Sequence, residues 1–130
     1  VRVKSEHRLD KPLRIYEYDS ARPPYNAFND LQPAKGVARA GNGMFAVAMP
    51  AKSAVFLTTD YVDRVPSEID DVDADDGRLT WDACEDPEHV YYRVFRNGRQ
   101  IRSTVATSCA IEDGDATYAV KSVDRWGNVR

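Results

Sequence analysis

The stretch 79–98 constrains the fold of this chain more than any other. It opens with apolar residues at alternate positions, Leu79, Trp81 and Ala83, and this period places all three on one face of a β-strand. A polar turn follows, and a second alternating run ends at Asn97-Gly98, a dipeptide typical of tight hairpins. The pattern therefore predicts antiparallel strands that share a buried core of aromatic and aliphatic side chains.

Strand patterns recur along the chain, whereas a helical period does not. In the first half we expect strands at 1–3, 13–18, 36–40, 44–49 and 54–59. The last of these runs is almost continuously apolar, which predicts a central strand. In the second half we expect short strands at 69–72, 79–83, 90–96, 100–102, 107–111 and 117–124. We therefore predict an all-β fold made of antiparallel β-sandwich modules.

The chain divides at Asp60–Pro66, where strand signals stop and Pro66 restarts the pattern. We interpret this stretch as a linker between residues 1–61 and residues 66–130. The passage 19–33 is a long proline-rich loop, and loops of this length are often functional or form interfaces. Both ends of the chain look cut, so we expect a fragment of a longer protein.

The second half resembles a fibronectin type III module, which has an immunoglobulin-like fold. The resemblance rests on Leu79-Thr-Trp81, Tyr92-Arg-Val94 and Tyr118-Ala-Val120. They put a tryptophan on the second strand and Tyr-x-Val pairs on the third and penultimate strands. The ending Ser122–Asn128 is similar to the close of such modules in bacterial carbohydrate enzymes. This chain is shorter, because its last strand has barely started at Val129.

The first half resembles the C-terminal β-sandwich tail of bacterial glycoside hydrolases of family 39 and its relatives. The matching stretches are Arg14–Asp19, Pro24–Gln32 and Val47–Tyr61. In that family the tail packs beside a catalytic (β/α)8 barrel. The catalytic carboxylates of the family lie in the barrel and match no position here. The resemblance therefore implies a non-catalytic piece whose partner is a barrel of the same polypeptide.

Composition excludes several classes of function. The net charge of -3 is small and dispersed, which argues against a nucleic-acid partner. No apolar run approaches the roughly 18 residues of a membrane span, so we expect no membrane partner. The N-terminal residues lack the apolar core of a signal peptide, and in a fragment this leaves the compartment undetermined.

The two cysteines do not form a disulfide framework. If Leu79, Trp81 and Ala83 face inward, Cys84 has the opposite parity and faces outward. Cys109 shares its parity with the apolar Ile111 and is expected to face the core. A disulfide needs Cβ atoms about 3.8 Å apart, so opposite parity favours two free thiols.

The acidic run 71–77 is the strongest candidate for a metal site. Asp71, Asp73 and Asp75 match the first alternating ligands of a calcium loop. Asp76, however, stands where such a loop needs glycine, with Gly77 one place late and Asp82 in place of a bidentate glutamate. The sequence therefore favours an acidic strand that runs into a tight turn.

Other candidate catalytic groups are ordinary surface features by sequence. The pairs Glu85/Asp86 and Glu112/Asp113 stand in turns, where neighbouring carboxylates are usually solvated. His7 and His89 lie far apart without metal-ligand spacing, and both are expected at the surface. Nothing marks a serine as a nucleophile; the two considered are Ser103 and Ser108. We predict no catalytic, cofactor or metal residue and no cofactor.

Aromatic residues leave one question open. Trp81, Tyr92 and Tyr118 are in phase with the core, whereas others could form a platform that stacks on sugar rings. The candidates for such a platform are Tyr16, Tyr18, Tyr25, Phe28, Tyr91 and Trp126. An alternative is that Tyr25 and Phe28 dock the long loop against a neighbouring domain in the longer protein, and that Trp126 covers the end of the second module.

These observations predict a non-catalytic C-terminal accessory fragment of a glycoside hydrolase, which packs against or spaces a catalytic barrel. Two alternatives stay open: a carbohydrate-binding module, and an extracellular adhesion or scaffold repeat. Open strand edges also predict a weak homodimer.

Overall fold

The computed structural model describes residues 1–6, 8–112 and 114–130, so His7 and Asp113 lie outside the described residues. The described chain forms strands and turns without a helix, and every strand pair is antiparallel. This confirms the prediction of an all-β, antiparallel fold. The described part accordingly has no helix able to cross a membrane. The chain forms two compact units, Val1–Tyr61 and Val62–Arg130.

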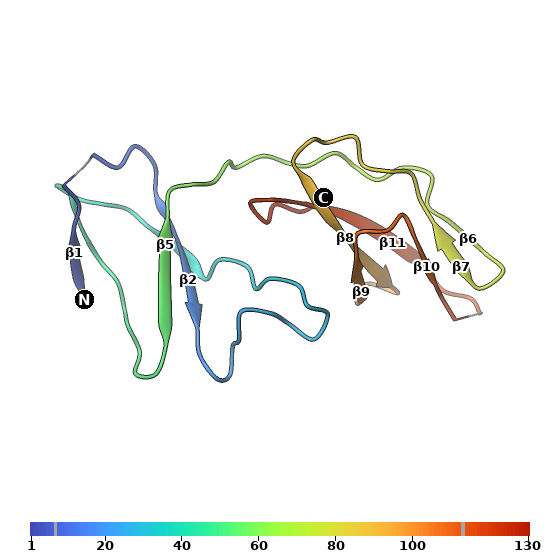
Figure 1. Ribbon diagram of the computed structural model, residues 1–130, viewed down its shortest axis with the longest axis horizontal. Helices are drawn as coiled ribbons and strands as arrows, with labels where there is room; N and C mark the ends of the chain where they lie inside the picture. The colour runs from blue at the N-terminus through green and yellow to red at the C-terminus, as the bar shows by residue number, and fades with distance from the viewer. Residues whose placement is uncertain (7, 113) are drawn as a thin grey trace. The chain divides into compact units, whose positions relative to one another are not determined.

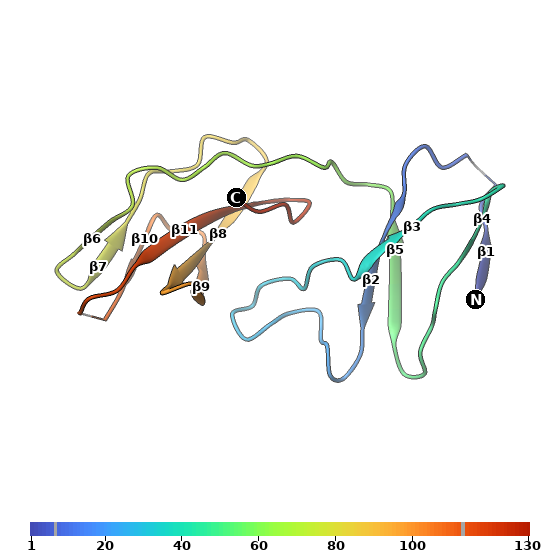
Figure 2. The ribbon, with the colours of Figure 1, turned by 180° about the vertical axis from the view of Figure 1, so that it is seen from behind.

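Two small sheets make up the first unit (Figure 1). One pairs β1 (Arg2–Lys4) with β4 (Met44–Ala46). The other has the order β3 (Gly36–Ala38), β2 (Leu13–Tyr18), β5 (Ala54–Thr58), and Figure 2 shows these three strands side by side.

The core of the first unit is small. Its buried members are Leu13, Phe45 and Val47, and the half-buried Val55 and Leu57 pack against them. Side chains alternate across a strand, so Leu13 of β2 shares one face of its sheet with Val55 and Leu57 of β5. This inner face covers Phe45, and the opposite face of the sheet carries the remaining residues of β2 and β5.

Two predictions for the first unit are wrong. The apolar run 54–59 predicts a central strand, but β5 lies at the edge of its sheet and Phe56 is exposed. The turn Gly41-Asn-Gly43 predicts a hairpin between its flanking strands. The turn itself forms, with Asn42 and Gly43 at φ 52° and 72°, but β3 pairs with β2 and β4 pairs with β1. Strands β3 and β4 therefore pair with strands distant in the sequence and not with each other.

The second unit contains two three-stranded sheets, with the orders β10-β7-β6 and β11-β8-β9. The strand bounds are β6 (Asp73–Asp75), β7 (Arg78–Thr80), β8 (His89–Arg96), β9 (Arg99–Thr104), β10 (Ser108–Ala110) and β11 (Tyr118–Asp124).

Two hairpins of this unit have the residues that their turns require. Strands β6 and β7 are joined through Asp76 (φ 44°) and Gly77 (φ 70°). Strands β8 and β9 are joined through Asn97 (φ 50°) and Gly98 (φ 78°), as the sequence predicts. Positive φ at both central positions is typical of type I′ turns, which Asn, Asp and Gly adopt most easily.

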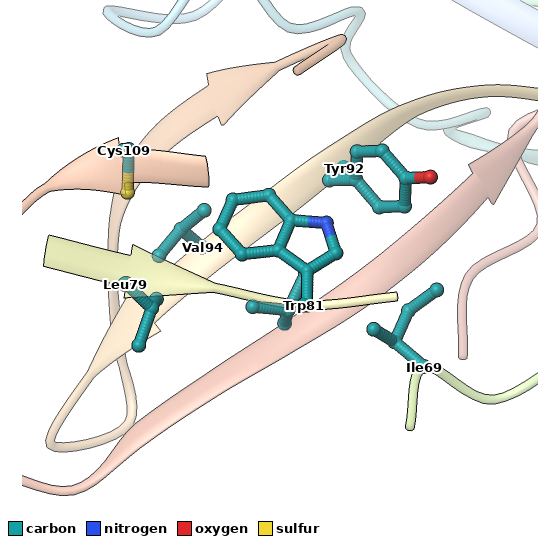
Figure 3. Close-up of a cluster of buried hydrophobic side chains, with 7 residues drawn as sticks. Ile69, Leu79, Trp81, Tyr92, Val94 and Cys109 are labelled. Atoms are coloured by element: carbon teal, nitrogen blue, oxygen red, sulfur yellow. The ribbon is translucent and has the colours of Figure 1, made fainter. Parts of the chain in front are cut away.

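Trp81 lies at the centre of the core of the second unit, among Leu79, Tyr92 and Val94 (Figure 3). Leu79 of β7 and Val94 of β8 are completely buried, so both sheets contribute to this core. The Trp81 and Tyr92 ring centroids are 5.5 Å apart at 72°, a favourable edge-to-face contact. The other buried members of the cluster are Ile69, Cys109 and Val120.

The alternation after Leu79 ends earlier than the sequence predicts. Strand β7 stops at Thr80, Ala83 is exposed, and Cys84 packs against the core, so the predicted parity of Ala83 and Cys84 is wrong. The Cys84 backbone N–H donates to Tyr92 Oη at 2.9 Å, which holds the chain there in an irregular conformation. Cys84 and Cys109 are both free thiols.

The predicted linker is largely part of the second unit. We name residues 62–69 the lead-in segment, because they precede the first strand of this unit. Pro66 is fully buried, and Ser122 Oγ donates to the Ser67 carbonyl at 2.7 Å. Ile69 belongs to the core, but the strand predicted at 69–72 is absent and the first ladder begins at Asp73.

Candidate functional site

The outer face of the β3-β2-β5 sheet is aromatic. Tyr16 and Tyr18 are two positions apart on β2 and therefore share a face. Phe56 stands directly opposite Tyr16 in the register of β2 with β5. We name Tyr16, Tyr18 and Phe56 the aromatic face. It lies on the side of the sheet opposite to Leu13 and Leu57, which point toward the core.

The three rings are in contact but are not coplanar. The Tyr16 and Tyr18 centroids are 6.5 Å apart with an interplanar angle of 34°. The Tyr18 and Phe56 centroids are 5.9 Å apart at 51°. Phe56 is 59% exposed, which is unusual for a phenylalanine within a strand, and the two tyrosines are half-buried. The surface is therefore apolar but uneven.

Burial raises the pKa of Tyr18, and the nearby Tyr16 and Tyr25 raise it further, while Arg22 opposes them. The phenol therefore stays protonated at neutral pH and remains a hydrogen-bond donor. Arg22 Nη1 donates to the Glu17 carbonyl at 3.1 Å, which holds the long loop beside β2.

Polar side chains order this loop. Asp19 Oδ1 accepts from the backbone N–H of Arg22 at 2.8 Å, and Arg22 Nη2 donates to the Pro33 carbonyl at 2.8 Å. Asn26 Oδ1 accepts from two further backbone N–H groups. Tyr25 is 55% exposed, so it does not pack against the rest of this chain, and its docking against a neighbouring domain stays a prediction. An Asp or Asn that starts a turn is the signal that sequence reasoning could have used.

A second cluster, in the second unit, is charged. We name Arg64, Asp86 and Asp124 the Arg64 network. Arg64 Nη2 donates to Asp86 Oδ2, and Arg64 Nε lies 3.6 Å from Asp124 Oδ2. The two carboxylates are 6% and 0% exposed, so both charges are compensated inside the protein. The guanidinium carbon of Arg64 also lies 5.9 Å from the ring centroid of Trp126.

Asp86 and Asp124 each hold a turn as well as the arginine. Asp86 Oδ1 accepts from the Glu88 N–H at 2.9 Å, and Asp124 Oδ1 accepts from the N–H groups of Trp126 and Asn128. The bond from Glu88 is the main cause that lowers the pKa of Asp86, and Arg64 adds to it against the opposing effect of burial. Asp86 is therefore ionised at neutral pH and acts as an acceptor, not as a proton donor.

His89 is half-buried, so its prediction as a surface residue is wrong. Its ring centroid lies 4.2 Å from that of Tyr92, next to the core. Burial lowers the pKa of His89, and the nearby Asp86 partly opposes this shift. His89 is therefore neutral at pH 7 and packs as a flat ring.

The other candidates have structural partners. Ser103 Oγ accepts from Gln100, Ser108 Oγ accepts from Arg78, and the exposed Glu112 pairs with Arg96. Arg93 donates to Tyr91 Oη at 3.3 Å. Of the residues considered for a sugar-stacking platform, Tyr16 and Tyr18 lie together on the aromatic face, and the other candidates are not part of that face. His7 and Asp113 lie outside the described residues.

The acidic run 71–77 forms β6 and its turn. Asp73 and Asp75 are exposed members of the strand, and Asp76 occupies the turn at positive φ. No three His, Cys, Asp or Glu side chains of the described residues are grouped to hold a metal ion.

A scan of this chain against protein-family models found no match, and searches of curated proteins and of solved structures found none either. The two family resemblances seen in the sequence therefore enter below as proposals.

Proposed function

We propose that this chain is a non-catalytic accessory part of a glycoside hydrolase. Its first unit packs through the aromatic face against a catalytic barrel of the same polypeptide. Its second unit is a fibronectin type III-like sandwich that acts as a spacer. The observation that carries the proposal is the aromatic face, in which Phe56 is exposed beside the half-buried Tyr16 and Tyr18, on a strand pair whose other face fills the core.

The tilt of the rings favours a protein partner over a sugar. A sugar ring stacks on flat, coplanar aromatic surfaces, whereas protein side chains fill uneven ones. The rings here are inclined at 34° and 51° to one another. Exposed apolar patches on strands commonly mark interaction sites, and a protein partner would bury Phe56.

The strand order of the second unit supports the sandwich assignment. An immunoglobulin-like sandwich pairs its first, second and fifth strands in one sheet and its third and penultimate strands in the other. The corresponding pairings here are β10-β7-β6 and β11-β8-β9. Val129 forms a bridge to Val123, which fits the start of a last strand beside β11.

The carboxylates of the Arg64 network support a non-catalytic role. Glycoside hydrolysis needs one carboxylic acid with a raised pKa that protonates the leaving group. The pKa of Asp86 is shifted in the opposite direction, and Arg64 and backbone N–H groups occupy its oxygens. We therefore expect no release of nitrophenol from nitrophenyl glycosides by this chain, and release would contradict the assignment.

The coding sequence before Val1 tests the partner, and a (β/α)8 barrel with two glutamates at strand ends is expected there. In the joined polypeptide, Phe56→Ala should cost about 3–5 kcal/mol of unfolding free energy, as for a buried phenylalanine. In the chain alone it should cost about 0.5 kcal/mol or less. Val105→Ala, at a residue 78% exposed in the second unit, is the matched control and should be neutral in both.

The second candidate is a carbohydrate-binding module, which the exposure of Phe56 keeps open. It requires heat of binding with xylan or galactan oligosaccharides in titration calorimetry, and loss of that heat in Phe56→Ala. The accessory proposal expects no heat. An equal cost of Phe56→Ala with and without the preceding barrel would refute packing through this face.

A further inference from the structure

Two turns of this chain contain the same dipeptide in the same conformation. Asn42 and Gly43 have φ values of 52° and 72° in the first unit. Asn97 and Gly98 have φ values of 50° and 78° in the second. Positive φ at both central positions is typical of type I′ turns, and both asparagines are exposed. The two turns therefore compare one reactive dipeptide at two places in the fold.

Asparagine followed by glycine is able to lose its side-chain amide without a catalyst. The backbone nitrogen of the glycine gives its proton to solvent and bonds to Cγ of the asparagine, and the amide nitrogen takes up a proton and leaves as ammonia. The succinimide ring that forms then adds one water molecule. Opening of the ring at Cγ gives aspartate, and opening at the backbone carbonyl carbon gives isoaspartate. Glycine favours the reaction because no side chain hinders the backbone rotation that brings its nitrogen to Cγ.

Hydrogen bonds to Thr117 hold Asn97 in place. The Asn97 N–H donates to the Thr117 carbonyl at 2.8 Å, and Asn97 Oδ1 accepts from the Thr117 N–H at 2.9 Å. Thr117 directly precedes β11, so these bonds tie the turn to the sheet of β11, β8 and β9. Cγ of Asn97 therefore turns toward the Gly98 nitrogen only after the bond at Oδ1 breaks.

The side chain of Asn42 has no such tether. Gly41 and Met44 close this turn with backbone hydrogen bonds in both directions, at 2.8 and 2.9 Å. The Ser5 N–H donates to the Gly43 carbonyl at 2.8 Å. No described residue forms a hydrogen bond with the side-chain amide of Asn42. The adjoining sheet has two strands, β1 and β4, and a two-stranded sheet opens more easily than a larger one.

We propose that Asn42 is a site of spontaneous deamidation, and that Thr117 protects Asn97 from the same reaction. The difference between the two asparagines exists in the folded chain, because unfolding removes the bonds to Thr117. Deamidation at Asn42 places a negative charge in the turn that leads into β4. In the isoaspartate form it also adds a backbone carbon between Gly41 and Met44. This inference does not depend on the accessory role proposed above.

Peptide mapping by mass spectrometry tests the proposal after storage of the folded full chain at mildly alkaline pH. Trypsin releases Asn42 within residues 40–52, and a glutamate-specific protease releases Asn97 within residues 89–112, and neither peptide contains another asparagine. Conversion of the amide to a carboxyl increases the peptide mass. We expect conversion at Asn42 to be faster by about tenfold or more, since reaction at Asn97 must break the two bonds to Thr117. In concentrated urea the two rates should become similar.

Three outcomes of this experiment would overturn the proposal. One is equal conversion of Asn42 and Asn97 in the folded chain. Another is a folded chain in which Asn42 stays unmodified while both asparagines convert in urea. The third is a preference for Asn42 that is as large in urea as in the folded chain, since the cause would then be the neighbouring sequence.

A pair of variants tests the role of Thr117. Thr117→Pro removes the N–H that donates to Asn97 Oδ1 and should speed conversion of Asn97 toward the rate at Asn42. Thr117→Ser keeps this N–H and is the matched control, in which Asn97 should stay protected. Tryptophan fluorescence in urea establishes that each variant is folded. Continued protection of Asn97 in folded Thr117→Pro would contradict the role of Thr117, and the comparison within the natural sequence tests Asn42 without any variant.

Discussion

The two units use their apolar side chains in different ways. In the second unit, residues of both sheets meet in one core, in which Leu79, Trp81 and Val94 are buried. Among the described residues of the first unit, the core cluster has three buried members, and an aromatic ring, Phe56, remains exposed. Since burial of a large apolar side chain contributes about 1.5–3 kcal/mol, the second unit has the larger internal source of stability. This difference is the reason for our proposal that the first unit packs against a partner.

Leu79→Ala and Leu13→Ala compare the two cores with the same substitution, and Leu79→Ala should have the larger effect. Leu79 is completely buried in the larger core, so its loss should cost about 2–5 kcal/mol, with Leu13 near the lower end of that range. Both tryptophans, Trp81 and Trp126, belong to the second unit, so their fluorescence in urea reports on that unit alone. Far-ultraviolet circular dichroism reports on both units.

A clear result requires the two variants to affect different transitions. Leu79→Ala should lower the urea midpoint seen by fluorescence. Leu13→Ala should leave that midpoint unchanged and lower only the midpoint of the first unit, which is seen by circular dichroism. If Leu13→Ala cost as much as Leu79→Ala, the proposed difference between the cores would be wrong.

Loss of the Asp86 charge should have the next largest effect. The carboxyl has a lowered pKa in the folded state, so its stabilising contribution is complete above the ordinary value of 3.8. It is lost as pH falls through the lowered folded-state pKa. Asp86→Asn should therefore be less stable than the natural sequence at pH 7, and the gap should close in strong acid. Urea midpoints measured by tryptophan fluorescence from pH 7 to pH 2 test this.

The matched control for Asp86→Asn is Glu112→Gln, which removes a carboxylate paired with Arg96 at the surface. Its effect should be within about 1 kcal/mol at every pH, as for most exposed ion pairs. A gap between Asp86→Asn and the natural sequence that persists at pH 2 would argue that the side-chain shape matters and the charge does not.

The sequence predicts the second unit better than the first. Alternation identifies Leu79, Trp81 and Tyr92 as core residues, and Asn97-Gly98 identifies the β8–β9 turn, because both signals act between near neighbours. The position of β5 at a sheet edge has no such local signal. Its apolar composition is equally consistent with a central strand and with an edge strand whose outer face is exposed.

The candidate sites were predicted in part. Tyr16 and Tyr18 are predicted to share a face by their spacing, but Phe56 joins them only through the pairing of β2 with β5. The Arg64 network escapes sequence reasoning for the same reason. Arg64 and Asp86 are 22 residues apart, and Asn128 reaches Val62 across 66 residues. Such contacts depend on strand register and on which distant segments lie side by side, and a short stretch of sequence contains neither kind of information.

His89 should make the second unit sensitive to mild acid. Because burial lowers its pKa in the folded state, the unfolded chain protonates first, near the ordinary value of 6.5. Stability should therefore fall as pH drops from 6.5 to the lowered folded-state value, and should not depend on His89 below that value. His89→Gln should remove this dependence. Fluorescence-detected urea midpoints at pH 7.5 and pH 5.5 give the measurement.

His89 is one of only two histidines, and it alone belongs to the second unit. A fall between pH 7.5 and 5.5 that is equal in His89→Gln and in the natural sequence would therefore show that other groups titrate. The difference in urea midpoint between His89→Gln and the natural sequence at pH 7.5, where His89 is neutral, measures the packing that is lost with the ring against Tyr92.

Phe56→Ala should have the smallest effect and is the most direct test of the contrast between the units. Phe56 is 59% exposed, so its removal from the chain alone should change the unfolding free energy by about 0.5 kcal/mol or less. Phe45→Ala, at a residue 9% exposed on the inner side of the same unit, should cost about 3–5 kcal/mol. Circular dichroism in urea measures both. If Phe56→Ala approached Phe45→Ala in cost, the aromatic face would already be part of a core, and the first unit would have no reason to need a partner there.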